Sequence, residues 1–194
     1  MTTLQLQTLA GCGLAIGRYP RFGYDASGGG GLAALGLHDR GGWQPLSFAA
    51  CGLTIPALSW RTTRFLGLPL PPGLSIAVHP ERLNGRWQPA TGALELQFDA
   101  RFRFALANLY QAPDLIVRTQ LTTREVRGLR HSAQGQPLDG MGQALLVGIA
   151  TVQPTGEAWL DRFLGLPDEA LAQLRCRLQP AVPAEADPKP AALA

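Results

Sequence analysis

The chain has 194 residues, of which 46% are hydrophobic and 16% charged, and its formal net charge is +3. This length and hydrophobic content suit one domain with a sizeable core, and the arginines alternate with acids rather than gathering into a nucleic-acid-binding surface. The 23 glycines and 16 prolines are spread along the chain, as in proteins with many short β connections. We therefore expect a β-rich domain that does not bind nucleic acid.

The cysteines and the N-terminus exclude several classes of protein. Cys12, Cys51 and Cys176 show no C-x-x-C or Cys/His spacing, so neither a disulfide framework nor a zinc site is predicted. The N-terminus lacks a basic stretch followed by an apolar run, and no segment reaches about 18 consecutive apolar residues. We expect a cytoplasmic protein without a signal peptide or transmembrane segment, or one peripheral to a membrane.

A glycine run stands out near the N-terminus, after short alternating pieces at 4–6 and 14–16 that predict strands. Gly28–Gly31 has no lysine nearby and does not match the phosphate-binding P-loop pattern. A flexible turn or a close approach of two backbones is therefore favoured over a nucleotide-binding loop.

An apolar, proline-rich segment follows a predicted strand at 60–65. Leu66–Gly73 contains three prolines, so it cannot belong to a central strand. Such a rigid loop either plugs one end of a barrel or, if it is exposed, forms a contact surface. The residues of that surface would be Leu66, Leu68 and Leu70.

The most regular segment of the chain is Ala93–Leu106, where apolar and polar residues alternate strictly. This period of two predicts a long strand with one interior and one exterior face. Its expected neighbours are residues 83–87 before it and 115–125 after it. The interior wall should be formed by Leu94, Leu96, Phe98, Phe102 and Phe104, which either fill the interior or line a space for a ligand.

A second alternating segment, 114–131, carries the only concentration of basic residues. Its polar face is expected to lie beside Glu95 and Asp99, because opposite charges on paired strands attract. The basic residues are either the ordinary solvated face of a strand or a surface for anionic lipid headgroups or an acidic protein. They are Arg118, Arg124, Arg127 and Arg130, with His131 beside them.

The C-terminal part predicts one helix between two strands. Residues 144–152 are apolar on both faces, which indicates a strand covered on both sides. A helix over 155–165, capped by Thr155, would supply the cover, and 168–171 would add one more turn. Alternation over 174–178 predicts a closing strand. The domain should span 1–179, with a disordered Pro/Ala-rich tail at 180–194.

No pattern in the sequence predicts a catalytic, cofactor-binding or metal-binding residue. The three histidines, His38, His79 and His131, have no accompanying nucleophile or metal-ligand signature. Glu95 and Asp99 are better explained as partners of arginines on a neighbouring strand than as a pair of glycosidase acids. An enzyme is therefore not favoured.

Four stretches resemble an uncharacterised protein family shared by cyanobacteria and plant chloroplasts. They are RFLGLPLPPGLSI, LNGRWQPATGALELQFDARFRF, LYQAPDLIVRTQLTTREVRG and LDGMGQALLVGIATV. The resemblance spans roughly residues 20–178. It implies an accessory role linked to photosynthetic membranes and carries no catalytic residues.

These patterns predict an all-β fold, an antiparallel meander that forms a barrel or barrel-like sandwich with one short helix near the C-terminus. A barrel of about eight strands can enclose one small ligand. The favoured function is a non-catalytic binding or accessory protein for a lipid, a pigment or a thylakoid protein complex. Two alternatives stay open: an enzyme that uses His or carboxylate residues at the barrel mouth, and a structural interaction domain with a filled core.

Overall fold

The computed structural model describes residues 3–107 and 109–181. Strands make up most of it, together with a short 3-10 helix, η1 (Ala50–Gly52), and one α-helix, α1 (Ala158–Leu164). The strands in chain order are β1 (Thr3–Thr8), β2 (Cys12–Ile16), β3 (Phe22–Tyr24), β4 (Gly30–Leu35), β5 (Gln44–Phe48), β6 (Thr63–Phe65), β7 (Leu68–Pro69), β8 (Leu74–Gln88), β9 (Ala93–Leu106), β10 (Tyr110–Gln111), β11 (Leu115–Thr122), β12 (Glu125–Arg127), β13 (Ser132–Gln134), β14 (Gln143–Val152) and β15 (Asp168–Pro180).

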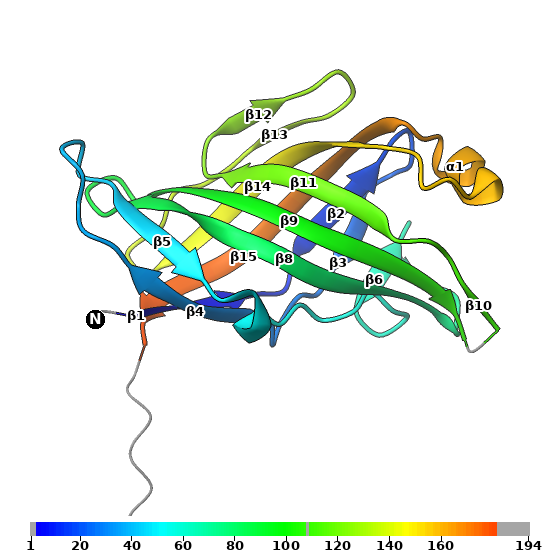
Figure 1. Cartoon of the computed structure of the whole chain (residues 1–194), viewed down its shortest axis with the longest axis horizontal. Helices are drawn as coiled ribbons and strands as arrows, with labels where there is room; N and C mark the ends of the chain where they lie inside the picture. The colour runs from blue at the N-terminus through cyan, green and yellow to red at the C-terminus, as the bar shows by residue number, and fades with distance from the viewer. Residues whose placement is uncertain (1–2, 108, 182–194) are drawn as a thin grey trace, which may run out of the picture.

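Eight of the strands close into a ring in the order β1-β4-β5-β8-β9-β11-β14-β15. The ring closes because β1 pairs with β4 on one side and with β15 on the other, both in antiparallel register. The longest strands, β8, β9 and β15, cross the molecule from one end to the other (Figure 1). The predicted antiparallel all-β fold with one short helix near the C-terminus is confirmed.

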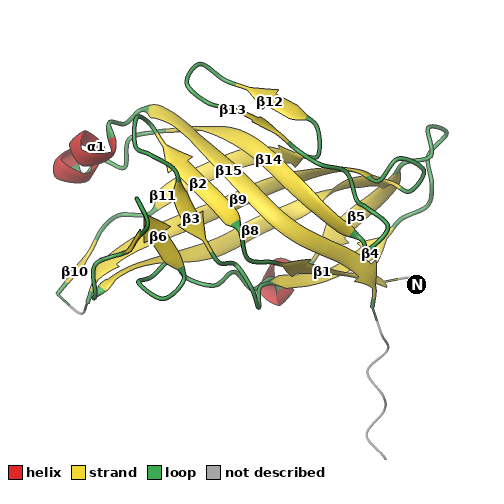
Figure 2. Ribbon diagram, turned by 180° about the vertical axis from the view of Figure 1, so that it is seen from behind, coloured by secondary structure: helices red, strands yellow, loops and turns green. Residues whose placement is uncertain are grey.

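The molecule has two halves, because β15 pairs with one strand in one part of its length and with another strand in the other part. Its last residues, 176–180, pair with β1, whereas 170–173 pair with β2, from which the sheet continues through β3 and β6 to β7. We call the half bounded by β1, β4 and β5 the closed half. We call the half bounded by β2, β3, β6 and β7 the open half; β10 and α1 lie at its end (Figures 1 and 2).

The predicted central strand and its neighbours are confirmed. β9 spans Ala93–Leu106 and lies between β8 and β11. β8 is one continuous strand rather than two pieces separated at Pro80, because the register shifts between Pro80 and Arg82. A bulge of this kind lets a strand continue past a proline that cannot donate a ladder hydrogen bond.

Two expectations for the second half of the chain are wrong, and a third, the helix as the cover of the 144–152 strand, is correct only in part. The strand predicted over 114–131 ends at Thr122, and the chain then forms the separate hairpin β12–β13. This hairpin lies over β14 (Figure 1), whereas α1 packs only against the end of that strand, where Leu160 and Leu164 share a buried cluster with Ala150 and Val152. Residues 168–171 belong to β15 instead of adding a helical turn. The helix ends at Gly165, whose φ of 71° is the left-handed conformation that stops helices.

Two further sequence interpretations concern the glycine run and the C-terminal tail. A Cβ atom on Gly30 would lie 2.0 Å from the carbonyl oxygen of Leu6, so this glycine permits a close approach of β4 to β1. The close-approach interpretation of the run is therefore confirmed at Gly30. Of the predicted tail, Pro180 ends β15, and residues 182–194 lie outside the described residues.

The closed half is filled with side chains. Its core is a cluster of aliphatic residues from the ring strands, among which Leu94, Leu96 and Leu146 have no exposed surface. Interior packing at this density leaves no room for a ligand. Among the helices that the structure describes, none has the length and apolarity needed to cross a membrane.

Candidate functional site: an apolar cavity in the open half

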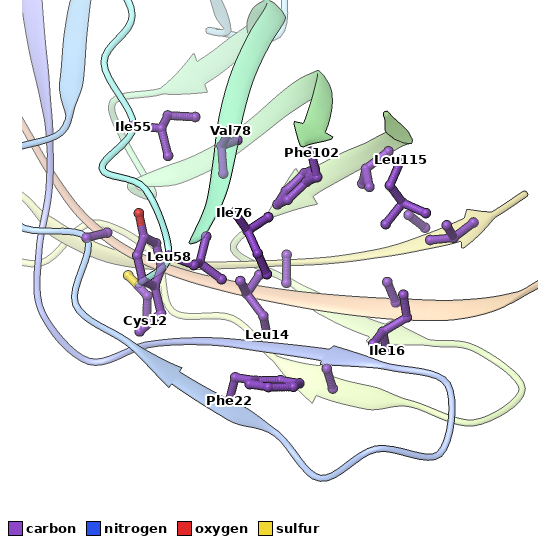
Figure 3. A pocket seen from close by; sticks show the side chains of 18 of the residues that line it. Cys12, Leu14, Ile16, Phe22, Ile55, Leu58, Ile76, Val78, Phe102 and Leu115 are labelled. Atoms are coloured by element: carbon purple, nitrogen blue, oxygen red, sulfur yellow. The ribbon is translucent and has the colours of Figure 1, made fainter. Parts of the chain in front are cut away.

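A cavity of about 590 Å³ occupies the interior of the open half. Its wall is built by β2, β3 and the segment 53–58 on one side and by β8, β9, β11 and β15 on the others. Figure 3 shows Leu14, Ile76 and Phe102 converging on this space from three different strands. The volume lies within the ~300–1,000 Å³ range of small-molecule sites.

The wall of the cavity is almost entirely hydrocarbon. Among its described residues there is no charged side chain and no histidine. Its polar side chains are largely engaged with the protein: Thr119 donates to the carbonyl of Ile149 at 2.9 Å, and Tyr24 donates to the carbonyl of Pro56. A ligand with polar groups along its length would leave those groups unpaired, which is costly. The wall therefore suits an apolar chain or ring system.

Two buried titratable side chains line the cavity, and both stay neutral. Burial raises the pKa of the Cys12 thiol, and burial also raises the pKa of the Tyr24 phenol. The Cys12 sulfur lies 3.2 Å from the carbonyl oxygen of Leu9. Because the thiolate is the reactive form of cysteine, a raised pKa makes Cys12 a poor nucleophile. The wall thus offers apolar contact rather than acid–base chemistry.

The mouth of the cavity is marked by residues that both line it and are exposed to solvent. They come from the end of β9, from β10 and from α1: Leu106, Tyr110, Trp159 and Phe163. The indole N–H of Trp159 donates to the hydroxyl of Tyr110 at 3.0 Å, and the two rings meet edge to face. The buried face of α1, with Leu160 and Leu164, completes this side of the wall.

Helix α1 is held in place at the mouth by polar contacts at its N-terminal end. The carboxylate of Asp161 accepts hydrogen bonds from the backbone N–H and the hydroxyl of Thr155, both at 2.7 Å, and from the N–H of Gly156 at 3.1 Å. These bonds lower the pKa of Asp161, the side-chain bond from Thr155 most of all. Thr155 is therefore not the N-cap that the sequence predicted; Glu157 occupies that position without a side-chain bond.

The predicted interior residues of β9 divide between the two halves. Leu94 and Leu96 lie in the filled core of the closed half. Phe98, Phe102 and Phe104 line the cavity. The aromatic residues thus border a space instead of filling it, which answers the question that the alternation pattern left open.

Much of the cavity wall was not predicted from the sequence. Tyr24, Ile55 and Leu58 belong to short strands or irregular segments, where alternation is too brief to indicate a face. The alternation of Leu14 and Ile16 in β2 was one available signal, and it did predict a strand.

Of the three leucines in the predicted apolar contact surface, two are exposed and one is buried. Leu68 lies in β7 and Leu66 precedes that strand, and both are exposed. Leu70 is not: its side chain is only 5% exposed and lines the cavity. The chain turns inward after Pro69, so that Leu70 packs against the wall formed with β8 and β9.

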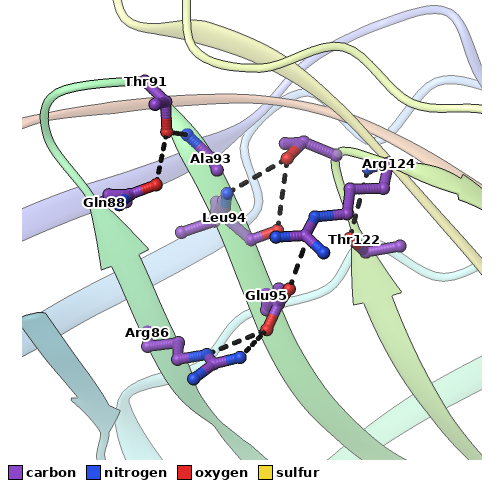
Figure 4. Close-up of polar contacts among 9 residues, drawn as sticks. Arg86, Gln88, Thr91, Ala93, Leu94, Glu95, Thr122 and Arg124 are labelled. Carbon is purple, nitrogen blue, oxygen red and sulfur yellow. Dashed lines mark hydrogen bonds and ion pairs between the residues drawn. The ribbon is translucent and has the colours of Figure 1, made fainter. Parts of the chain in front are cut away.

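The predicted basic contact surface is largely neutralised by ion pairs. Arg124 lies 3.7 Å from Glu95, whose carboxylate also accepts two bonds from Arg86 (Figure 4). Arg127 pairs with Glu125 at 2.6 Å and Arg130 with Asp168 at 2.7 Å. Arg118 stands opposite Asp99 in the β9–β11 register, as expected. These contacts support the ordinary solvated face, the alternative that the sequence left open.

The histidines lie away from the cavity. His38 and His79 are exposed on the outside, and His131 lies at the β12–β13 hairpin. Within residues 3–107 and 109–181, no three His, Cys, Asp or Glu side chains are grouped so that they could hold a metal ion.

Comparison with known proteins adds no further argument. No family model, curated protein or solved structure matches the chain. The resemblance to proteins of cyanobacteria and chloroplasts thus stays a prediction.

Proposed function

We propose that this protein is a non-catalytic binding protein that holds one elongated apolar molecule, a lipid or the hydrocarbon part of a pigment. The observation that carries the proposal is the 590 Å³ cavity with its hydrocarbon wall and its mouth beside α1. The sequence resemblance makes thylakoid lipids and pigments the first ligands to test, with an accessory role at photosynthetic membranes as the biological setting.

The size of the cavity favours a ligand over a packing defect. Protein interiors normally contain few voids larger than a water molecule, because unfilled space forfeits contacts between side chains. An apolar cavity of about 150 Å³ is already large enough to stay dry and take up benzene. The cavity here is several times larger, and the same strands pack tightly in the closed half.

The wall also predicts how the ligand is oriented. Apolar side chains such as Leu6, Leu83 and Leu121 form the part of the wall that adjoins the closed half. At the mouth, the indole N–H of Trp159 donates to the hydroxyl of Tyr110, and both residues are exposed to solvent. A lipid would therefore insert its hydrocarbon chain toward the closed half and leave its polar head at the mouth.

The two alternatives fit the cavity less well. An enzyme that uses histidine or carboxylate groups would need them in the wall or at its mouth, and the described wall residues include neither. A structural domain with a filled core would need side chains in the space that the open half leaves free.

Native mass spectrometry of the protein purified from its own cells tests the proposal. We expect one retained apolar molecule per chain, recovered by solvent extraction, and saturable binding of a fluorescent fatty acid by protein stripped of it. The variant Leu14→Trp places an indole in the cavity and should reduce binding at least about tenfold. Its matched control, Ile116→Trp, adds the same ring on the exposed face of β11 and should bind normally.

Three results would overturn the proposal. They are the absence of any retained molecule together with no binding of the fluorescent fatty acid, equal binding by Leu14→Trp and Ile116→Trp, or a bound molecule located outside the cavity. If Leu14→Trp fails to fold, Phe102→Gln replaces it, since a polar amide in the wall should weaken the binding of an apolar chain without adding volume.

A further inference from the structure

Exposed apolar side chains gather at the end of the open half. They come from the β6–β7 turn, from the end of β9 together with the residue that precedes β10, and from α1. These three segments lie at the same end of the molecule in both views (Figures 1 and 2). Their exposure ranges from 48% for Leu106 to 88% for Leu109. We call this set the apolar crown: Leu66, Leu68, Leu106, Leu109, Trp159 and Phe163.

We propose that the apolar crown docks on the surface of an anionic lipid bilayer, with the mouth of the cavity facing the lipid. Clustered exposed hydrophobic residues on a monomeric protein mark interaction sites, whereas single ones are ordinary. The crown residues of α1 and β9 also line the cavity. Docking would therefore connect the cavity directly with the apolar phase of the membrane, and the cargo would not have to cross water.

The side chains around the crown favour a bilayer as the partner. Arg18, Arg64 and Arg162 are exposed at this end, and none has a carboxylate within ion-pair distance among the residues that the structure describes. Tyr110 and Trp159 combine an apolar ring with a polar group, as is typical of side chains at membrane–water interfaces. Unpaired arginines beside an apolar patch match anionic lipid headgroups.

Three acids near the crown have partners of their own within the protein, and none of them forms an ion pair with Arg18, Arg64 or Arg162. Asp161 binds the Thr155–Gly156 segment, Asp168 pairs with Arg130, and Glu169 accepts the N–H groups of Leu129 and Arg130. The arginines of the β12–β13 hairpin, by contrast, are in ion pairs, Arg127 with Glu125 and Arg130 with Asp168. The membrane contact thus differs from the basic surface that the sequence predicted.

The test is flotation of the full chain with lipid vesicles of phosphatidylcholine, with and without phosphatidylglycerol. The triple variant Leu66→Asn, Leu68→Asn and Leu109→Asn removes three exposed crown residues that do not line the cavity. We expect the bound fraction to fall at least about tenfold, because three apolar side chains lose their burial in the membrane. Asparagine suits Leu66, whose φ is 52°, since it tolerates the left-handed region.

A matched triple variant controls for surface polarity. Leu37→Asn, Leu129→Asn and Met141→Asn replace exposed apolar residues outside the crown and should leave flotation unchanged. The pair Arg64→Gln and Arg162→Gln should reduce binding to vesicles with phosphatidylglycerol and leave binding to phosphatidylcholine alone unchanged.

Three results would overturn the docking proposal. They are equal flotation of the crown triple and the wild type, equal loss in the control triple, or a dimer in solution that the crown triple converts to a monomer, which would make the crown an interface between two copies. The choice of lipid as the partner rests partly on the proposed function, but the two fail separately. Leu14→Trp should still float while it loses its ligand, and the crown triple should keep its ligand while it no longer floats.

Discussion

The closed and open halves are built on the same long strands, yet one is filled and the other is hollow. Along β9, Leu94 and Leu96 are buried completely in the closed half, whereas Phe98 and Phe102 border the cavity. The alternation is identical in both halves. The difference comes from the opposite side of the ring, where β1, β4 and β5 close the circle in one half and short strands diverge from it in the other.

The comparison shows that an apolar strand face does not by itself specify a packed core. The distance between the strands that face each other across the interior decides whether their side chains make contact. In the closed half that distance is short because β1 pairs with both neighbours, and Gly30 lets β4 approach. In the open half, an isolated bridge between Leu58 and Ile76, instead of a continuous ladder, joins the segment 53–58 to β8.

The largest loss of stability is expected from a substitution at Gly30, where β4 lies close to β1 in the closed half. Gly30→Ala would place a Cβ atom 2.0 Å from the Leu6 carbonyl oxygen at a φ of 133°. We expect it to prevent folding or to lower the free energy of unfolding by more than about 4 kcal/mol. Urea unfolding followed by circular dichroism measures the change.

Gly28→Ala is the matched control for this substitution. Gly28 also has a positive φ, of 89°, but a Cβ atom there would meet nothing within 4 Å. We expect a cost of about 1 kcal/mol, from the backbone conformation alone. Equal losses at both positions would contradict the idea that the approach of β4 to β1 seals the closed half.

A smaller loss of stability is expected when one apolar side chain is shortened in the interior of either half, and its size should differ between the halves. Leu96→Ala removes a fully buried side chain from the filled core and should cost about 2–5 kcal/mol in free energy of unfolding. Leu14→Ala removes a side chain that already faces open space and should cost only about 1–2 kcal/mol. The measurement is again urea unfolding, with ligand-free protein for both variants. A larger loss for Leu14→Ala would mean that the open half is packed as tightly as the closed half.

The smallest effect concerns the helix at the mouth. The pKa of Asp161 is lowered, so the stabilisation by its hydrogen bonds is present at neutral pH and is lost as the pH falls through this lowered value. Asp161→Asn should therefore speed amide hydrogen exchange in α1 and ligand release, and should remove the rise in α1 opening that acid causes in the wild type. Global stability should change little, because the carboxylate of Asp161 bonds to the short segment just before α1.

Asp139→Asn provides the control for Asp161. Asp139 likewise accepts backbone N–H groups, those of Met141 and Gln143, but in a turn that leads into β14 in the closed half. This variant should leave hydrogen exchange in α1 and the rate of ligand release unchanged. A change in ligand release in Asp139→Asn, or none in Asp161→Asn, would show that α1 does not control the mouth.

The sequence by itself determined the local properties of the strands. The strict alternation of β9 predicted its bounds, its interior face and its neighbours, because a period of two assigns every side chain to a face. The charges of Arg118 and Arg124 predicted their position beside Asp99 and Glu95. Apolar residues on both faces of β14 indicated that it is covered, although the sequence did not indicate that the β12–β13 hairpin covers it.

Only the tertiary structure decided where the interior is filled and where it is hollow. β15 exchanges β1 for β2 partway along its length, and nothing in its own sequence marks that change, because backbone pairing is set by distant segments. The cavity follows from this divergence, as do the inward position of Leu70 and the gathering of the apolar crown at one end. These features depend on distances across the ring, which periodicity along the chain does not encode.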